Sequence, residues 1–215
     1  MKVGILGSGD VARALGTGFT ATGHPVRLGS RRPDQTALVE WAAKAGPKGS
    51  LGSFADAAGF GEVVVLATRG LATPDAIRDA GVTHFGTKIV IDATNPLEPG
   101  ADGVPRLARG ASPSNGEAVQ ALLPHARVVK AFNIIGNPHM FHPTFPGGPP
   151  DMFICGNDES AKRAVETILH EFGWPSVIDI GGIEGSRELE ALCILWVKSA
   201  LALNNFSIAF KLLRK

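Results

Sequence analysis

The stretch Lys2-Val3-Gly4-Ile5-Leu6-Gly7-Ser8-Gly9-Asp10-Val11-Ala12 decides the fold class of this 215-residue chain. A short apolar run, typical of a buried strand, passes directly into two glycines and then into a helical pattern. In the pattern G-x-G-x-x-A, Gly7 permits a tight turn, Gly9 lets the backbone approach a pyrophosphate, and Ala12 keeps the helix close to the strand. The backbone amides near residues 8–11 then face an anion at the positive end of the helix. The stretch predicts a Rossmann dinucleotide-binding unit; the alternative is that both glycines serve only a tight turn.

The end of the second expected strand, Gly29-Ser30-Arg31-Arg32, indicates which dinucleotide is bound. About 20 residues beyond the glycine pattern, NAD-binding proteins usually carry an Asp or Glu that holds the ribose hydroxyl groups. A serine hydroxyl and two guanidinium groups instead suit a 2′-phosphate, which a carboxylate would repel. Ser30, Arg31 and Arg32 therefore predict NADP(H) rather than NAD(H), unless the arginines are only solvated loop charges. Asp34 is expected to cap the next helix or lie in its first turn.

Short Val- and Ile-rich runs alternate with longer helical patterns through the first half of the chain. This alternation is typical of parallel strands joined by crossover helices. We therefore expect an α/β fold with a Rossmann doubly wound, mainly parallel sheet. The expected strands cover residues 3–6, 26–28, 63–67, 89–91 and 128–129. The expected helices cover residues 11–22, 34–45, 54–59, 74–79 and 116–123.

A Pro/Gly-rich loop over residues 136–150 interrupts this alternation and is too long for a routine connection. We expect it to join an NADP-binding Rossmann domain, residues 1–135, to a small C-terminal α/β part, residues 151–215. The elements expected in that part are strands at 152–155 and 177–180, a helix at 159–172 and a long final helix at 186–213.

The final helix is apolar enough to predict a homodimer seam as well as a contribution to the core, because one small subunit can hardly cover it. Its large apolar positions near helical spacing are Leu189, Leu192, Trp196, Leu203 and Phe206.

Composition excludes several classes of function. Lys and Arg number 21 against 20 Asp and Glu, so the net charge of +1 offers no basic field for nucleic acid or a membrane surface. The apolar stretch 191–210 contains one lysine and two asparagines, so no membrane span is expected. Cys155 and Cys193 follow no disulfide or metal spacing, and the chain begins without a signal-peptide pattern, so a cytoplasmic protein is expected. His139 and His142 lack a nearby Cys or carboxylate, so no metal site is expected.

Five motifs carry a more specific signal. They are Gly7-Ser8-Gly9-Asp10-Val11-Ala12, Gly29-Ser30-Arg31-Arg32, Asp92-Ala93-Thr94-Asn95-Pro96, Lys130-Ala131-Phe132-Asn133 and Cys155-Gly156-Asn157-Asp158. Together they resemble the NADP oxidoreductase, coenzyme F-420-dependent family over nearly the whole chain. The Lys-Ala-Phe-Asn segment and Gly185-Ser186-Arg187-Glu188 look closer to the reductase domains of STEAP metalloreductases and their soluble bacterial relatives. The resemblance implies an NADPH-dependent oxidoreductase that transfers a hydride between NADP(H) and a flavin or deazaflavin (F-420-type) ring stacked on the nicotinamide.

The resemblance and the positions of the strand ends together give a set of expected cofactor-binding residues. They are Gly7, Ser8, Gly9, Asp10, Val11, Ser30, Arg31, Arg32, Ala67, Thr68, Arg69, Asn95, Pro96, Ala131 and Asn133. Open α/β sheets bind ligands at the carboxyl ends of their strands, and these positions agree with that rule. No catalytic residue is assigned, since hydride transfer asks mainly for orientation and exclusion of water.

Several side chains near these positions have two interpretations. Lys130, Phe132 and Asn133 either line the nicotinamide or flavin pocket, with Asn133 fixing a carboxamide or ring edge and Phe132 stacking, or Phe132 is core and Asn133 caps a turn. Arg69 and Arg187 either hold an anionic substrate tail or are surface and ion-pair residues.

Two other functions share the N-terminal pattern. An imine or keto reductase of the pyrroline-5-carboxylate reductase type usually has a larger helical second domain, for which this chain looks short. The second alternative is a non-catalytic protein. It would be an NADP(H) sensor, or a docking subunit that serves a membrane partner as in the STEAP arrangement. The sequence leaves the hydride acceptor open.

Overall fold

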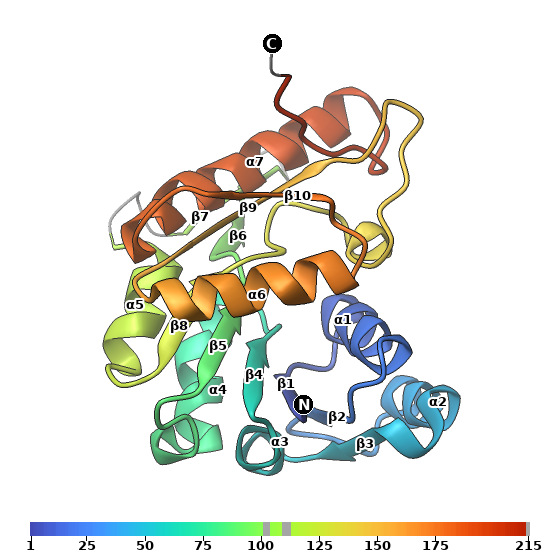
Figure 1. Ribbon diagram of the computed structural model, residues 1–215, viewed down its shortest axis with the longest axis vertical. Helices are drawn as coiled ribbons and strands as arrows, with labels where there is room; N and C mark the ends of the chain where they lie inside the picture. The colour runs from blue at the N-terminus through green and yellow to red at the C-terminus, as the bar shows by residue number, and fades with distance from the viewer. Residues whose placement is uncertain (101–103, 109–112, 214–215) are drawn as a thin grey trace.

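One eight-stranded sheet runs through the computed structural model, which describes residues 1–100, 104–108 and 113–213 (Figure 1). The strand order is β10-β9-β8-β5-β4-β1-β2-β3. The strands are β1 Val3–Leu6, β2 Val26–Gly29, β3 Gly49–Gly52, β4 Val63–Leu66, β5 Ile89–Asp92, β8 Arg127–Lys130, β9 Asp151–Gly156 and β10 Ser176–Asp179. From β3 to β8 every neighbouring pair is parallel, β9 runs antiparallel to β8, and β10 is parallel to β9. The expected doubly wound, mainly parallel sheet is therefore confirmed.

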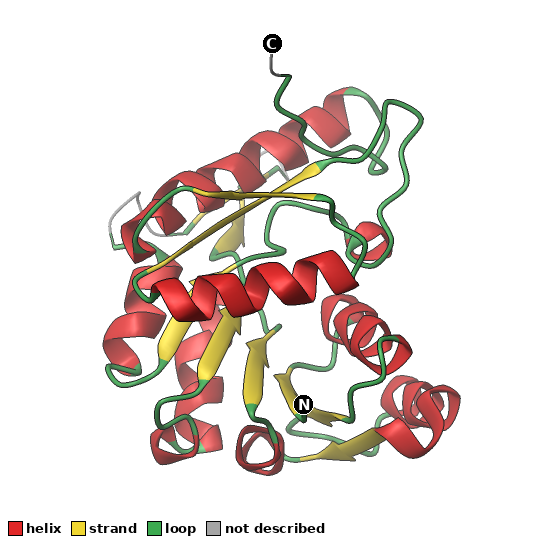
Figure 2. Ribbon diagram, in the orientation of Figure 1, coloured by secondary structure: helices red, strands yellow, loops and turns green. Residues whose placement is uncertain are grey.

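Helices cover both faces of the sheet, as Figure 2 shows. They are α1 Asp10–Ala21, α2 Thr36–Ala45, α3 Phe54–Phe60, α4 Thr73–Ala80, α5 Asn115–Leu122, α6 Glu159–Glu171 and α7 Ser186–Ala202. Successive strand residues point to opposite faces, so Val63 and Val65 pack with α1, α2 and α6, whereas Val64 and Leu66 pack with α3, α4 and α5. Both faces are apolar because parallel strands with crossover helices are buried on both sides.

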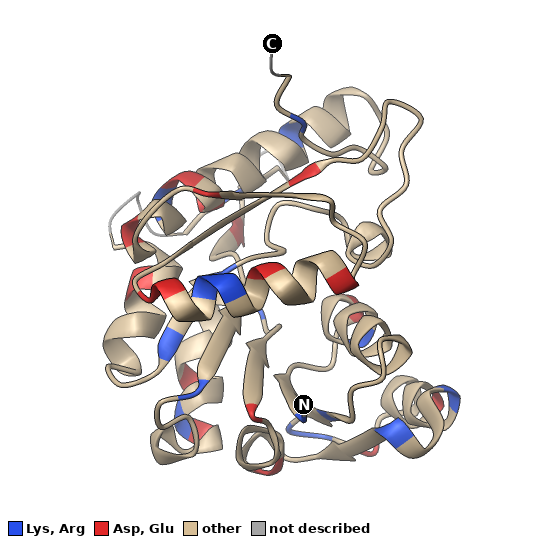
Figure 3. Ribbon diagram, in the orientation of Figure 1, with Lys and Arg blue, Asp and Glu red and all other residues tan. Residues whose placement is uncertain are grey.

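Acidic and basic residues are interspersed on these helices (Figure 3). Among the residues that the structure describes, none of the helices has both the length and the apolar character that a membrane crossing requires.

The long final helix was expected to continue to residue 213, and this prediction is wrong: α7 ends at Ala202. Asn204 takes a left-handed backbone conformation with φ of +46°. The amide of Asn204 donates to the carbonyl of Leu201, and the amide of Asn205 donates to the carbonyl of Ala200. These two bonds form a Schellman motif, which ends a helix by using its last free carbonyls.

The residues after α7 fold back along the chain that enters β9. The indole Nε1 of Trp196 donates to the carbonyl of Ile208 at 2.8 Å. The amide of Asp151 donates to the carbonyl of Phe210, and Oδ2 of Asp151 accepts from the amide of Leu212 at 2.6 Å. The C-terminal segment thus ties the end of α7 to the start of β9.

Two further elements were not expected. Strand β3 has the sequence Gly-Ser-Leu-Gly, which lacks the Val and Ile content that predicts a strand. A small hairpin, β6 Leu97–Pro99 with β7 Pro105–Leu107, follows β5.

The core that lines one face of the sheet includes residues from both sides of the 136–150 loop. The division into domains 1–135 and 151–215 stays a prediction.

Candidate nucleotide-binding site

Six parallel strands end at one edge of the sheet, and every expected cofactor-binding residue lies after the end of one of five of them. These five strands are β1, β2, β4, β5 and β8, and they pair with one another in parallel (Figure 1). The chain reverses its direction of winding between β1 and β4, which lie side by side at the centre of the parallel part of the sheet. Ligands of doubly wound sheets bind at the carboxyl edge beside such a switch point.

The glycine loop has the geometry of an anion cradle. Gly7 has φ of +151°, and a Cβ there would come within 3.0 Å of the carbonyl of Ala67, so only glycine fits between the ends of β1 and β4. Gly9 is exposed, and a Cβ built on it would meet no described atom within 4 Å. Gly9 also precedes the first turn of α1 without any side-chain cap, so amides of that turn stay available to a ligand.

Asp10 brings a negative charge to this cradle, but a neighbouring arginine balances it. The guanidinium of Arg13 pairs with the Asp10 carboxylate and also donates to the carbonyl of Ser8 at 2.8 Å. The Asp10 side chain is 72% exposed. Its charge is thus offset and directed towards solvent, which lowers the repulsion that a pyrophosphate would meet.

The segment after β2 is cationic and hydrogen-bonded into a turn. Ser30 is buried, and its Oγ accepts from the amide of Arg32 and from Nε2 of Gln35, both at 3.1 Å. With both lone pairs used, the Ser30 proton remains to donate to a ligand. Arg31 and Arg32 are exposed, and within the described ranges neither guanidinium has a carboxylate partner within 4.0 Å. Two unpaired guanidinium groups beside a serine donor have the charge and the hydrogen-bond donors that suit a phosphate.

The expectation that Asp34 caps the second helix or lies in its first turn is wrong. Helix α2 begins at Thr36 and Gln35 occupies the cap position. The Gln35 amide closes the preceding turn through Ser30 Oγ and the carbonyl of Arg32, so the chain enters the helix two residues later than predicted.

The segments after β4 and β5 touch each other. Thr68 Oγ1 lies 2.9 Å from Thr73 Oγ1, which donates to the carbonyl of Arg69. A Cβ on Gly70 would lie within 3.0 Å of the backbone of Asn95, so the two segments pack backbone against backbone. The Arg69 side chain is exposed and lacks a carboxylate partner among the described residues.

The segments after β5 and β8 are joined by two asparagine side chains. Nδ2 of Asn95 donates to the carbonyl of Asn133 at 2.7 Å, and Nδ2 of Asn133 donates to Oδ1 of Asn95 at 2.9 Å. Nδ2 of Asn133 also donates to the carbonyl of Leu189 in α7. Asn95 is partly exposed whereas Asn133 is buried, so the pair has one member at the surface and one behind it.

Two neighbours of Asn133 do not line a pocket. Phe132 is fully buried, with its ring 5.6 Å from that of Phe172, so it belongs to the core. Its backbone has φ of +64°, an unusual conformation for a bulky residue that turns the chain sharply after β8. Lys130 is fully buried too, in an ion cluster.

That ion cluster, which sequence reasoning missed, joins four segments of the chain. Nζ of Lys130 lies 2.9 Å from Oδ2 of Asp92, 2.9 Å from Oε1 of Glu190 and 2.8 Å from the carbonyl of Thr94. Glu190 also accepts from the amides of Asn115 and Gly116 at the start of α5. Burial alone would lower the pKa of Lys130, but Asp92 and Glu190 outweigh it and hold this pKa above its ordinary value. The sequence did contain a signal for this cluster, because two charged residues, Asp92 and Lys130, end neighbouring apolar strands.

Arg187 is an ion-pair residue rather than a free anion binder. Its guanidinium binds both carboxylate oxygens of Glu117 in α5. The hydrogen bond from Arg187 lowers the pKa of Glu117 from 4.5 to about 2.

Burial raises the pKa of Cys155 to about 11 and that of Cys193 to about 12, so both thiols stay protonated and unreactive near neutral pH.

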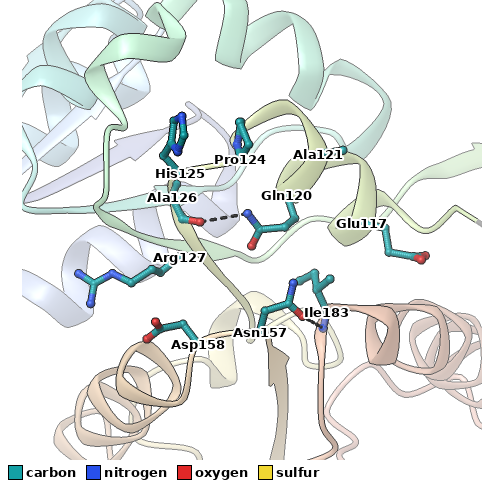
Figure 4. Close-up of a pocket in the computed structure, with 10 residues that line it drawn as sticks. All are labelled: Glu117, Gln120, Ala121, Pro124, His125, Ala126, Arg127, Asn157, Asp158 and Ile183. Atoms are coloured by element: carbon teal, nitrogen blue, oxygen red, sulfur yellow. Dashed lines mark hydrogen bonds between the residues drawn. The ribbon is translucent and has the colours of Figure 1, made fainter.

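A cavity of about 540 Å³ lies elsewhere, between α5, the start of β8 and the end of β9 (Figure 4). Its lining includes Gln120, Arg127, Asn157 and Asp158. Arg127 begins β8, so the cavity extends to the amino edge of the parallel strands, away from the edge where the expected cofactor residues lie.

The comparisons with known proteins agree on one family. The family model described as NADP oxidoreductase coenzyme F420-dependent matches residues 2–96. The F420-dependent NADP reductase of Methanocaldococcus jannaschii is 30% identical over 207 residues, which are 92% of this chain and 91% of that protein. A crystal structure of a proposed F420-dependent NADP reductase from Arthrobacter sp. FB24 has 34% identity and a TM-score of 0.94, with 100% of both chains covered.

Two other likenesses are more limited. The metalloreductase STEAP3 of Rattus norvegicus is 32% identical over 206 residues, but this chain spans only 36% of its length. A reductive aminase from Aspergillus terreus has a TM-score of 0.65 at 18% identity and is covered to 62%, so it shares the fold alone.

The substitution Lys130→Met should lower the free energy of unfolding by about 3–5 kcal/mol, because it leaves two buried carboxylates without their cation. Lys162→Met is the matched control: Lys162 is also buried, but its partners Glu159 and Asp179 are 69% and 40% exposed. Water can solvate those partners, so the control should cost about 1 kcal/mol or less. Denaturant unfolding measures both, and equal losses would contradict a special role for the Lys130 cluster.

Proposed function

Because the chain belongs to the NADP oxidoreductase, coenzyme F420-dependent family, we propose that it binds NADP(H) along the carboxyl edge of its sheet and transfers a hydride between this cofactor and a flavin or deazaflavin ring. The observation that carries the proposal is a pair of features on one edge. The open cradle at Gly9 suits a pyrophosphate, and the unpaired Arg31 and Arg32, with no carboxylate within residues 29–32 at the end of β2, suit a 2′-phosphate.

Each segment at the edge has a proposed part in binding. Gly7, Ser8, Gly9, Asp10 and Val11 surround the pyrophosphate through their backbone, while Ser30, Arg31 and Arg32 hold the 2′-phosphate. The nicotinamide half lies against the segments after β4, β5 and β8, whose proposed contacts are Ala67, Thr68, Arg69, Asn95, Pro96, Ala131 and Asn133. These segments already touch one another, so the nicotinamide half meets a preformed surface.

The chemistry requires little from side chains. When bound, NADPH supplies a hydride, one hydrogen with both electrons of its C4–H bond, to an oxidised ring stacked on the nicotinamide. The chain contributes orientation and exclusion of water. Its small residues Ala67, Ala93 and Ala131 at the strand ends are buried in the core.

The coenzyme preference should depend on Arg31. The wild-type chain should bind NADPH more tightly than NADH, and Arg31→Ala should weaken NADPH binding about tenfold to a hundredfold with NADH unchanged, as expected for a charged hydrogen bond to phosphate. Calorimetric titration measures both affinities.

Arg78→Ala is the control, since Arg78 is an exposed arginine paired with Asp75 in α4. It should leave both affinities unchanged. Equal binding of NADPH and NADH by the wild-type chain would contradict the proposed 2′-phosphate site.

The acceptor is tested by supplying NADPH with F420, FMN, FAD and riboflavin, each under anaerobic conditions. We expect loss of the near-ultraviolet absorbance of NADPH together with bleaching of at least one ring, in equal molar amounts. Turnover of a cyclic imine without reduction of any ring would instead assign the chain to the imine reductases that share its fold. Tight NADPH binding without any turnover would favour a sensor, and either result overturns the proposed acceptor class.

A homodimer through α7 and the segment after it is the proposed assembly. Large exposed apolar side chains gather there: Leu195, Leu201, Leu203, Phe206, Leu212 and Leu213. The double substitution Leu195→Glu/Leu203→Glu should convert a dimer into a monomer, as measured by light scattering after size exclusion, because it places charges in the apolar contact. Val39→Glu changes a comparably exposed residue of α2 and should leave the dimer intact. A monomeric wild-type chain would refute this assembly.

A further inference from the structure

One buried side-chain atom among the described residues has no hydrogen-bond partner, and it lies beside the proposed cofactor site. It is Oδ1 of Asn133, in a residue that is only 4% exposed. Buried polar atoms of native proteins are nearly always paired, since an unpaired one keeps the full penalty of leaving water. The hydrogen-bond donor that would pair with Oδ1 of Asn133 must therefore come from outside the folded chain.

The orientation of this amide follows from its neighbours. Nδ2 of Asn133 lies 2.9 Å from Oδ1 of Asn95 and 2.9 Å from the carbonyl oxygen of Leu189. Exchanging N and O would place the Asn133 oxygen against two other acceptors, which is repulsive. The unpaired atom is thus an acceptor, and its missing partner is an N–H or O–H donor.

The ion cluster holds this amide in place from both sides. Thr94, whose carbonyl accepts from Lys130, directly precedes Asn95, and Glu190, which also binds Lys130, directly follows Leu189. Both partners of the Asn133 amide nitrogen are therefore adjacent in sequence to residues that bind one buried ammonium.

We propose that Oδ1 of Asn133 accepts a hydrogen bond from the carboxamide NH₂ of the nicotinamide and so selects dinucleotides that carry this amide. The assignment rests on the proposed NADP(H) binding. Asn133 and its partner Asn95 follow β8 and β5, on the side of the edge away from the arginines after β2, where the nicotinamide half lies in that proposal. The carboxamide NH₂ is joined to a rigid ring by one rotatable bond, so a fixed acceptor would also set the rotation of this group.

The test compares two cofactor analogues with NADP⁺. In 3-acetylpyridine adenine dinucleotide phosphate a methyl group replaces the NH₂, whereas the thionicotinamide analogue keeps the NH₂ and changes only the oxygen to sulfur. The acetylpyridine analogue should bind the wild-type chain about tenfold more weakly than NADP⁺, and the thionicotinamide analogue within about twofold, because only the former leaves the acceptor unpaired.

Asn133→Ala should remove this tenfold difference, since the acceptor itself is gone. Asn115→Ala is the matched control: Asn115 is 1% exposed, and its side-chain amide donates to Thr94 Oγ1 at 2.7 Å. Both variants lose buried hydrogen bonds and some stability, but the control should keep the tenfold discrimination. The analogue comparison on the wild-type chain stands even if Asn133→Ala does not fold.

Binding of 2′,5′-ADP separates the two ways of failing, because it carries the 2′-phosphate and adenosine but no nicotinamide. If 2′,5′-ADP binds and the wild-type chain does not discriminate between NADP⁺ and the acetylpyridine analogue, the Asn133 contact is overturned while NADP(H) binding stands. If neither 2′,5′-ADP nor NADP⁺ binds, the proposed function fails, and this contact fails with it.

Discussion

One buried ammonium group links most of the segments on the nicotinamide side of the sheet. Lys130 binds a carboxylate from the end of β5, another from α7 and a backbone carbonyl from the turn after β5. Two carboxylates against one cation leave an excess of negative charge, which the amides at the start of α5 offset. Because none of these groups meets water, each depends on the others, and the position of α7 across the strand ends depends on them all.

The fold followed from local patterns wherever those patterns were strong. The Val- and Ile-rich runs lie in β1, β2, β4, β5 and β8, because buried parallel strands need apolar residues on both faces. Strand β3 escaped prediction because Gly-Ser-Leu-Gly forms an edge strand only through its pairing with β2. The end of α7 escaped for a related reason: Asn204 stops the helix by a backbone motif, while the apolar pattern continues beyond it.

The candidate site also has parts that local sequence motifs predict and parts that they do not. The glycine loop and the serine–arginine turn are local motifs whose chemistry can be read from a few adjacent residues, and the structure places them side by side on one edge. Glu190 could not be read this way, since it joins Lys130 only after α7 has folded across the sheet. The residue type of Phe132 did not decide between stacking on a bound ring and packing in the core. The backbone turn after β8 directs its ring into the core.

The rim of the sheet is a chain of direct contacts between successive segments. Gly7 abuts Ala67, Gly70 abuts Asn95, and Asn95 is bonded to Asn133, so no flexible spacer separates the segments after β1, β4, β5 and β8. Thermal motion in one segment must therefore be shared with the next. A molecule that restricts the glycine loop would lower the entropy cost of ordering the asparagine pair, so the two halves of a dinucleotide would bind cooperatively without any change of shape.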